Sequence, residues 1–236
     1  MTAQPRLLIP LASAAMSFFT ANAVIASDDF PGAEPDRDVL STQQKVDSLF
    51  EKGDYDRAIF IYREELAPLG DKYAQYMLGY MHLTGKGVPR DAIAASAWYR
   101  LAAERGEPHF VQARDKLWKL LNEQHRAQSD LNYIELRKYY SDATLVSNLV
   151  ASDLAVLGED VKRIGLTDGL VGAADYQSNK ARTTQNTELI EQIEVRMNYL
   201  KQMLDSGQVY GATEIERIED LQQQAAALIA PHEFPD

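Results

Sequence analysis

The stretch of sequence that decides the fold spans residues 74–106 and reads AQYMLGYMHLTGKGVPRDAIAASAWYRLAAERG. It contains two apolar segments with a short connection between them, and that connection carries Gly85, Gly87 and Pro89. Glycine adopts positive φ angles without strain, as a tight connection between helices requires. The pattern therefore predicts two short antiparallel helices, an αα-hairpin.

Small residues recur at helical spacing in both segments: Ala74, Gly79, Ala95 and Ala102. We expect the two helices to cross at these positions, because small side chains let two backbones approach closely. Larger side chains are expected to fill the space between this hairpin and its neighbours: Leu78, Trp98 and Tyr99.

Weaker versions of the same pattern lie on both sides. Upstream, Ser41-Thr42 predicts a helix cap, Gly53-Asp54-Tyr55 a turn, and Pro68 the end of a second helix. Downstream, Ala113-x-x-x-Leu117 restarts the pattern. Helical hairpins that recur along a chain are typical of repeat proteins.

These residues resemble the Sel1-like repeat, a tetratricopeptide-like family, over about residues 42–121. The resemblance is best over 74–106, where Leu-Gly, Gly-x-Gly-Val, Asp and Ala-x-x-Trp-Tyr-x-x-Ala-Ala follow in the family's order. His82 departs from it, since the family usually has tyrosine there. The resemblance implies an all-α fold that begins with a short Sel1- or tetratricopeptide-like α-solenoid.

The resemblance also implies a binding surface. In such arrays the first helix of each hairpin lines a concave face, which typically binds peptides or protein segments. Carrying the register across places five residues on this partner-binding face: Phe50, Tyr73, Tyr76, Tyr80 and Leu83. The tyrosines form one stripe with the broad, amphipathic rings that are enriched at interfaces. The alternative is that C-terminal helices of the same chain cover the stripe.

The N-terminal residues predict export. Arg6 precedes an apolar stretch over residues 7–26, which contains small-residue cleavage patterns ending at Ala23 and at Ala26. This is typical of a secretory signal peptide, with an uncleaved anchor helix as the alternative. We therefore expect an exported bacterial protein, periplasmic or secreted, with cleavage near Ala23 or Ala26 and no membrane insertion afterwards.

The C-terminal half, residues 124–236, predicts a helical domain. Apolar spacing indicates a helix over 129–157 with a break at Ser141-Asp142. From Thr187 the spacing is that of a coiled-coil seam, and a glycine-containing turn follows it. We expect an antiparallel helical hairpin here, with a homodimer through residues 187–230 as the alternative.

Glycines interrupt the chain between these helices: Gly158, Gly165, Gly169 and Gly172. Such spacing is typical of connectors, and we predict an irregular region up to about Asn186. The sequence leaves the role of residues 124–186 open. The expected segments are a signal peptide (1–26), an extended leader (27–40), a repeat domain (41–123) and a C-terminal helical domain (124–236).

Composition excludes several classes of function. The chain of 236 residues has a net charge of −11 and no cluster of Lys and Arg, which argues against nucleic acid as a partner. It has no cysteine, so disulfides and thiolate catalysis are excluded. The histidines are isolated in sequence, and serine-nucleophile motifs are absent. We therefore expect no catalytic residues, no metal, no cofactor and no enzyme activity.

The function expected from this combination is that of an adaptor or scaffold. Its partner would be a protein, in the cell envelope, bound through the helical repeat surface. A cell-wall-directed hydrolase or ligand-binding protein is the alternative. The identity of the partner, the pathway and the oligomeric state are left open by the sequence.

Overall fold

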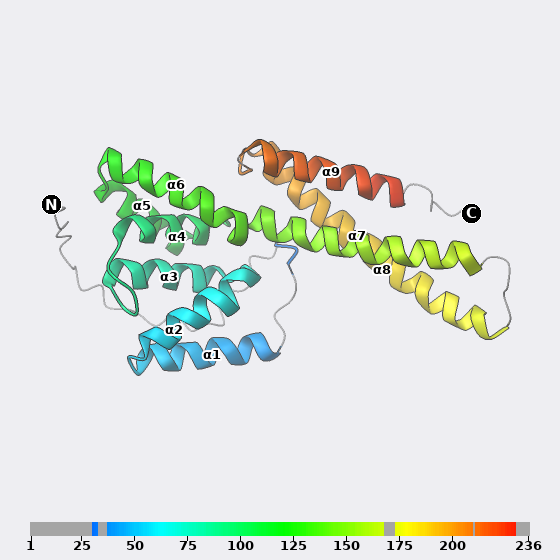
Figure 1. The fold of residues 1–236 in the computed structure, drawn as a ribbon, viewed down its shortest axis with the longest axis horizontal. Helices are drawn as coiled ribbons and strands as arrows, with labels where there is room; N and C mark the ends of the chain where they lie inside the picture. Colours follow the sequence, from blue (N-terminus) through cyan, green and yellow to red (C-terminus); the bar gives the residue numbers. More distant parts are fainter. Residues whose placement is uncertain (1–29, 33–36, 168–172, 210, 230–236) are drawn as a thin grey trace.

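The computed structural model describes residues 30–32, 37–167, 173–209 and 211–229. The expected signal peptide lies outside these residues. The described residues form helices and no strand, which confirms the predicted all-α fold. Figure 1 shows two parts side by side, a stack of short helices (α1–α6) and a bundle of longer ones (α7–α9).

The first hairpin consists of α1 (Arg37–Glu51) and α2 (Tyr55–Ile61). The chain turns between them at Gly53, which has a φ of 82°. A π-helical turn, η2 (Tyr62–Leu66), and a 3-10 turn, η3 (Ala67–Leu69), complete the second helix. The predicted turn and helix end are therefore confirmed.

Helix α1 begins before the predicted cap at Ser41-Thr42, so the expected extended leader is wrong for residues 37–40. Two features extend the helix. Val39 packs against the core of the repeat, and Asp38 lies in the first turn, where the helix dipole favours a negative charge.

The second hairpin consists of α3 (Lys72–Thr84) and α4 (Ala92–Ala102). Asp71 and Asp91 begin these helices, because their carboxylates accept hydrogen bonds from backbone N–H groups of the first turn. The helices cross at Gly79, where an added Cβ would lie 2.5 Å from the ring of Tyr99. The close crossing predicted from small residues is confirmed.

Helices α5 (Pro108–Leu120) and α6 (Glu123–Tyr140) both pack on α4. Tyr133 and Tyr140 of α6 join the core of the repeat. That core is built from buried residues of α1 to α4: Val46, Ala58, Tyr62, Leu66, Met77, Leu78, Met81, Trp98 and Leu101. The helical stack thus continues to Tyr140, and the expected boundary between residues 123 and 124 falls at the start of α6.

The C-terminal part is a bundle of α7 (Asp142–Thr167), α8 (Ala173–Asp205) and α9 (Ala212–Ile229). The predicted break at Ser141 is confirmed, since α6 ends just before it. Helices α8 and α9 form the predicted hairpin, and α7 packs along both (Figure 1). The seam residues Ile193 and Leu200 are fully buried in this bundle, so the seam packs within the chain.

The irregular region predicted after Gly158 is wrong for the described residues, because α7 runs on to Thr167 and α8 already begins at Ala173. Residues 168–172, with Gly169 and Gly172, lie outside the described part. A glycine inside a helix costs only about 1 kcal/mol relative to alanine. Burial of the preceding apolar side chains of α7 outweighs this cost.

Candidate functional site

The five predicted site residues lie on α1 and α3, and all are half-buried: Phe50, Tyr73, Tyr76, Tyr80 and Leu83. We call them the aromatic face. Their side chains pack against the apolar clusters of the repeat. The apolar cluster of the described part of α7–α9 includes none of them.

Two residues of the aromatic face, Phe50 and Tyr80, form an aromatic cage together with Tyr55 of α2. The ring centroids of Phe50 and Tyr55 lie 5.1 Å apart, and those of Phe50 and Tyr80 lie 6.1 Å apart. The ammonium nitrogen of Lys86 lies 4.7, 4.8 and 5.2 Å from the centroids of Phe50, Tyr55 and Tyr80. The cage therefore already holds a cation, one from the chain itself.

The loop between α3 and α4 brings Lys86 to the cage. Gly85 and Gly87 flank it with φ angles of 77° and 71°. An added Cβ on Gly87 would lie 2.6 Å from the carbonyl oxygen of Tyr55. The predicted glycine loop thus lies directly against the residue that opens α2. Lys86 and Tyr55 were not predicted as site residues from the sequence, although the two glycines of the loop were recognised in it.

Carboxylates gather beside Tyr73, the first residue of the aromatic face in α3. The hydroxyl of Tyr62 donates a hydrogen bond of 2.9 Å to Asp47. Burial raises the pKa of Asp47, the hydrogen bond from Tyr62 opposes this, and the charges of Asp71 and Glu51 raise it further. Burial and the charge of Asp47 likewise raise the pKa of Tyr73 well above its ordinary value. Three carboxylates, those of Asp47, Glu51 and Asp71, therefore act on this part of the surface.

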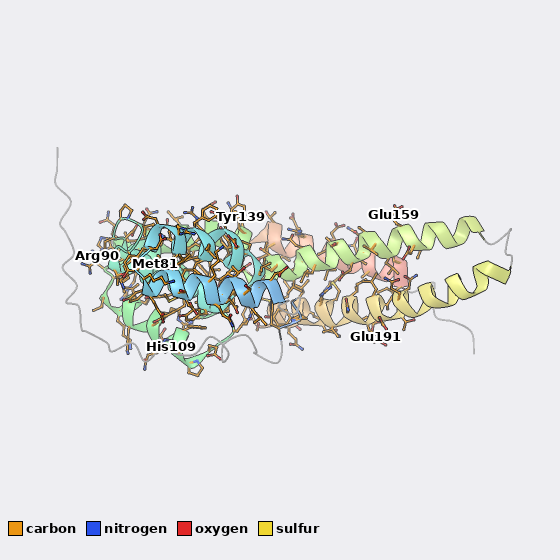
Figure 2. All side chains as sticks on the ribbon, turned by 90° about the horizontal axis from the view of Figure 1, so that it is seen from below. Met81, Arg90, His109, Tyr139, Glu159 and Glu191 are labelled. Carbon is orange, nitrogen blue, oxygen red and sulfur yellow. The ribbon has the colours of Figure 1, made fainter. Side chains whose placement is uncertain are left out.

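The aromatic face also contacts α4 and α5. The ring of Tyr76 stacks on Tyr99 at 5.3 Å and lies 5.3 Å from Phe110 and 5.2 Å from His109. Leu83 joins Tyr99 in the neighbouring apolar cluster. In Figure 2, His109 lies at the outer edge of the repeat and Met81 lies inside it. The aromatic face therefore lies on α1 and α3 and is in contact with α4 and α5.

A second polar site lies where the repeat meets the C-terminal bundle. We call it the charged junction, and its members are Lys72, Glu104, Arg105, Arg137, Asp142 and Glu214. The side chain of Lys72 is 2% exposed, and its ammonium lies 2.9 Å from Glu104 and 3.1 Å from Asp142. Arg105 donates two hydrogen bonds to Asp142, of 2.8 and 2.9 Å. This cluster was not predicted from the sequence, because isolated charges on helices are usually solvated.

Arg137 completes the junction from α6. Its guanidinium lies 3.3 Å from Glu104 and donates a hydrogen bond of 2.9 Å to Glu214 at the start of α9. Burial raises the pKa of Asp142, but the charges of Lys72 and Arg105 outweigh burial and hold that pKa below its ordinary value. Three cations thus balance three carboxylates. The junction joins the two parts of the molecule through ion pairs of α3, the turn after α4, α6, α7 and α9.

Phe30 and Pro31 lie against the same region. The guanidinium of Arg105 stacks over the ring of Phe30 at 3.5 Å, and Phe30 meets Tyr199 edge to face at 5.9 Å. Arg196 donates a hydrogen bond to the carbonyl oxygen of Pro31. The short described segment before α1 is therefore held on the bundle by aromatic and polar contacts.

Within the described residues, no three His, Asp or Glu side chains are placed to hold a metal ion. His82 has a buried Nδ1 without a hydrogen-bond partner. Burial lowers the pKa of His82 more than the nearby charge of Asp91 raises it. As to membranes, none of the helices in the described ranges is both long and apolar enough to cross one.

The fold and the aromatic face define a class, that of all-α proteins built from stacked helical hairpins. Within the chain, the model of the Sel1 repeat family matches residues 72–107, which comprise α3, the glycine loop and α4. The chain thus contains a Sel1 repeat, as its residue pattern predicts. No curated protein and no solved structure matches the chain. Sel1 repeats generally mediate protein–protein interaction and are typically non-enzymatic scaffolds.

Proposed function

We propose that this protein is a protein–protein interaction adaptor and that its aromatic face binds a basic segment of a partner protein. The observation that carries the proposal is the aromatic cage around Lys86. Three rings converge on one ammonium group, and a ring face attracts a cation with about 0.5–2 kcal/mol. The cage therefore has the chemistry to take a lysine or arginine side chain from a partner.

The charge around the face supports the same partner. Asp47 and Glu51 of α1 lie beside Tyr73, and the chain as a whole has a net charge of −11. A negative surface raises the rate at which a cationic partner associates. The rings of Tyr73, Tyr76 and Tyr80 are half-buried, which leaves part of each ring open for contact.

Lys86 acts as a displaceable occupant in this proposal. Its side chain is half-buried, and its neighbours in the cage are the rings of Phe50, Tyr55 and Tyr80. A cation from a partner gains the same ring contacts and adds the apolar contacts of its flanking residues. The exchange is therefore favourable when the partner also contacts Tyr73 and Tyr76.

A titration with a labelled peptide tests the proposal. A fluorescein-labelled Lys-rich peptide should bind the wild type, while a Glu-rich peptide of equal length should not. Tyr80→Ala should weaken binding about tenfold or more, because tyrosine is enriched at interface hot spots, where truncation costs about 2 kcal/mol or more. Tyr139→Ala is the matched control, since Tyr139 is 66% exposed on α6, away from the face. Equal binding of both peptides, or equal effects of both variants, would contradict the proposal.

We also propose that the protein acts outside the cytoplasm, in the periplasm or as a secreted protein, with a cell-envelope partner. The support is the pattern of residues 1–26, a basic start followed by an apolar stretch and small-residue cleavage patterns. Mass spectrometry of the protein purified from its own cells is the test. A mature N-terminus near Val24 or Ser27 is expected, and a chain that retains Met1 would contradict cleavage.

A further inference from the structure

We propose that a pocket between α4, α5 and α6 binds a small organic carboxylate that carries a flat apolar group. The pocket has a volume of about 560 Å³, within the range of small-molecule sites. It contains none of the residues of the aromatic face, so the proposal stands apart from the adaptor function. It is lined by residues of both parts of the molecule.

The pocket exists because α5 and α6 pack on α4 but not tightly on each other. Met203 of α8 and Gln208 of the turn that follows close one end of it. Gly106 lines the pocket just before α5, and an added Cβ there would meet no atom within 4 Å. The space is therefore left open by the backbone as well as by the side chains.

Guanidinium groups from three helices line the pocket: Arg100 of α4, Arg114 of α5 and Arg137 of α6. The pocket thus brings three cations together in a chain whose net charge is −11. The carboxylates that share the lining are Glu104 and Asp115. Glu104 already accepts hydrogen bonds from Lys72, Tyr133, Arg137 and the backbone N–H of Asp142, so we expect a ligand carboxylate to contact Arg100 and Arg114 and not Arg137.

The protein partners of these two arginines are carboxylates that solvent reaches. Arg100 pairs with Asp130 and Arg114 with Asp115, and each of these carboxylates is 50% exposed. Ion pairs between exposed groups contribute little to stability. A guanidinium donates two parallel hydrogen bonds to a carboxylate in a fixed fork. A ligand carboxylate can therefore replace Asp115 on Arg114 at little energetic cost.

Aromatic and apolar side chains complete the site and favour a flat ligand. The guanidinium of Arg100 lies 4.0 Å from the ring centroid of Tyr133 and 5.3 Å from that of Trp118. These rings hold Arg100 in place. Val111, Trp118 and Met203 supply apolar surface beside it. A planar group attached to a carboxylate thus meets apolar walls next to the arginines.

Tryptophan fluorescence reports directly on this pocket. The chain has two tryptophans. Trp98 is 4% exposed in the core of the repeat, whereas Trp118 lines the pocket. The probes are N-acetylphenylalanine and its amide, which differ in the carboxylate alone. We expect the acid to change the fluorescence of the full chain with saturation below about 10 mM, and the amide to bind at least tenfold more weakly.

Variants locate the binding. Arg114→Ala should lower the affinity for N-acetylphenylalanine about fivefold or more, because it removes a charge-assisted hydrogen bond. Arg57→Ala, on an exposed arginine of α2 outside the pocket, should change nothing. Trp118→Phe should abolish the fluorescence change while the acid still raises the melting temperature. Phe50→Ala, in the aromatic cage, should leave the affinity unaltered. The proposal is overturned by any of three results: no saturable response to the acid, equal affinities for acid and amide, or unchanged affinity in Arg114→Ala.

Discussion

The charged junction and the aromatic face each hold one lysine of the same Sel1 repeat, in two different environments. Lys72 is surrounded by carboxylates and is almost fully withdrawn from solvent. Lys86 is surrounded by aromatic rings and stays partly open. A buried charge that loses its partner has no water to replace it, whereas an open one is resolvated at once. The junction is therefore fixed structure, and the cage is a place where cations can exchange.

The largest effect is expected at the junction. Asp142→Asn leaves Lys72 and Arg105 without their shared carboxylate, and we expect a loss of about 3 kcal/mol in the free energy of unfolding. Urea denaturation measures it. The matched control is Glu135→Gln, which removes an exposed ion pair with Lys138 and should change stability by less than about 1 kcal/mol. Equal effects would mean that the junction is not more tightly coupled to folding than a surface pair.

The effect of Asp142→Asn on the free energy of unfolding should depend on pH, and the pKa of Asp142 sets the direction of this dependence. The pKa of Asp142 is lower in the folded state than its ordinary value, so the folded state favours the charged form. Its contribution is complete above the unfolded pKa of about 3.9 and is lost as the pH falls through the lower, folded pKa. The stability difference between wild type and Asp142→Asn should be constant above about pH 5 and shrink below pH 4. A difference that grows on acidification would contradict this account.

Two glycines, one in the repeat and one in the C-terminal bundle, should respond in opposite directions to substitution by alanine. In Gly79→Ala the new Cβ would lie 2.5 Å from Tyr99 and 3.2 Å from the carbonyl oxygen of Ala95, so we expect a loss of about 1–3 kcal/mol through overpacking. In Gly158→Ala of α7 the nearest atom is Leu228 Cδ1 at 3.9 Å, so a gain of up to about 1 kcal/mol is expected from helix propensity. Thermal unfolding of both variants checks the opposite signs. A loss in Gly158→Ala equal to that in Gly79→Ala would refute the contrast.

The glycines also show which parts of the structure a sequence can predict. Gly79, Gly85 and Trp98 lie within one hairpin, and their spacing alone encodes the helix crossing and the loop. Gly158 lies in α7, whose helix depends on packing against α8 and α9 from far along the chain. The pattern of local residues therefore predicted the second hairpin correctly and the region after Gly158 wrongly.

The same distinction between local spacing and packing of distant segments applies to the candidate sites. The tyrosines of α3 were placed on one face by helical periodicity, which is a local property. The junction was invisible because Lys72 meets Glu104 and Asp142 only after α4, α6 and α7 have packed. The pocket was also hidden, since it depends on how far α5 and α6 diverge on α4.

The smallest effect on stability, and the most informative for function, is expected at the cage. Lys86→Ala removes cation–π contacts from a partly open site, so the free energy of unfolding should fall by less than about 1 kcal/mol. The same change empties the cage of its own cation, and the fluorescein-labelled Lys-rich peptide should then bind about two- to fivefold more tightly in the titration described above. Lys138→Ala, at an exposed position of α6, is the control for the loss of one positive charge.

If both variants strengthen binding equally, net charge explains the effect. If Lys86→Ala weakens binding, Lys86 contributes to the partner surface itself and the cage is a structural clip. Only tighter binding that is specific to Lys86→Ala makes this lysine a displaceable occupant, in contrast to Lys72 at the junction.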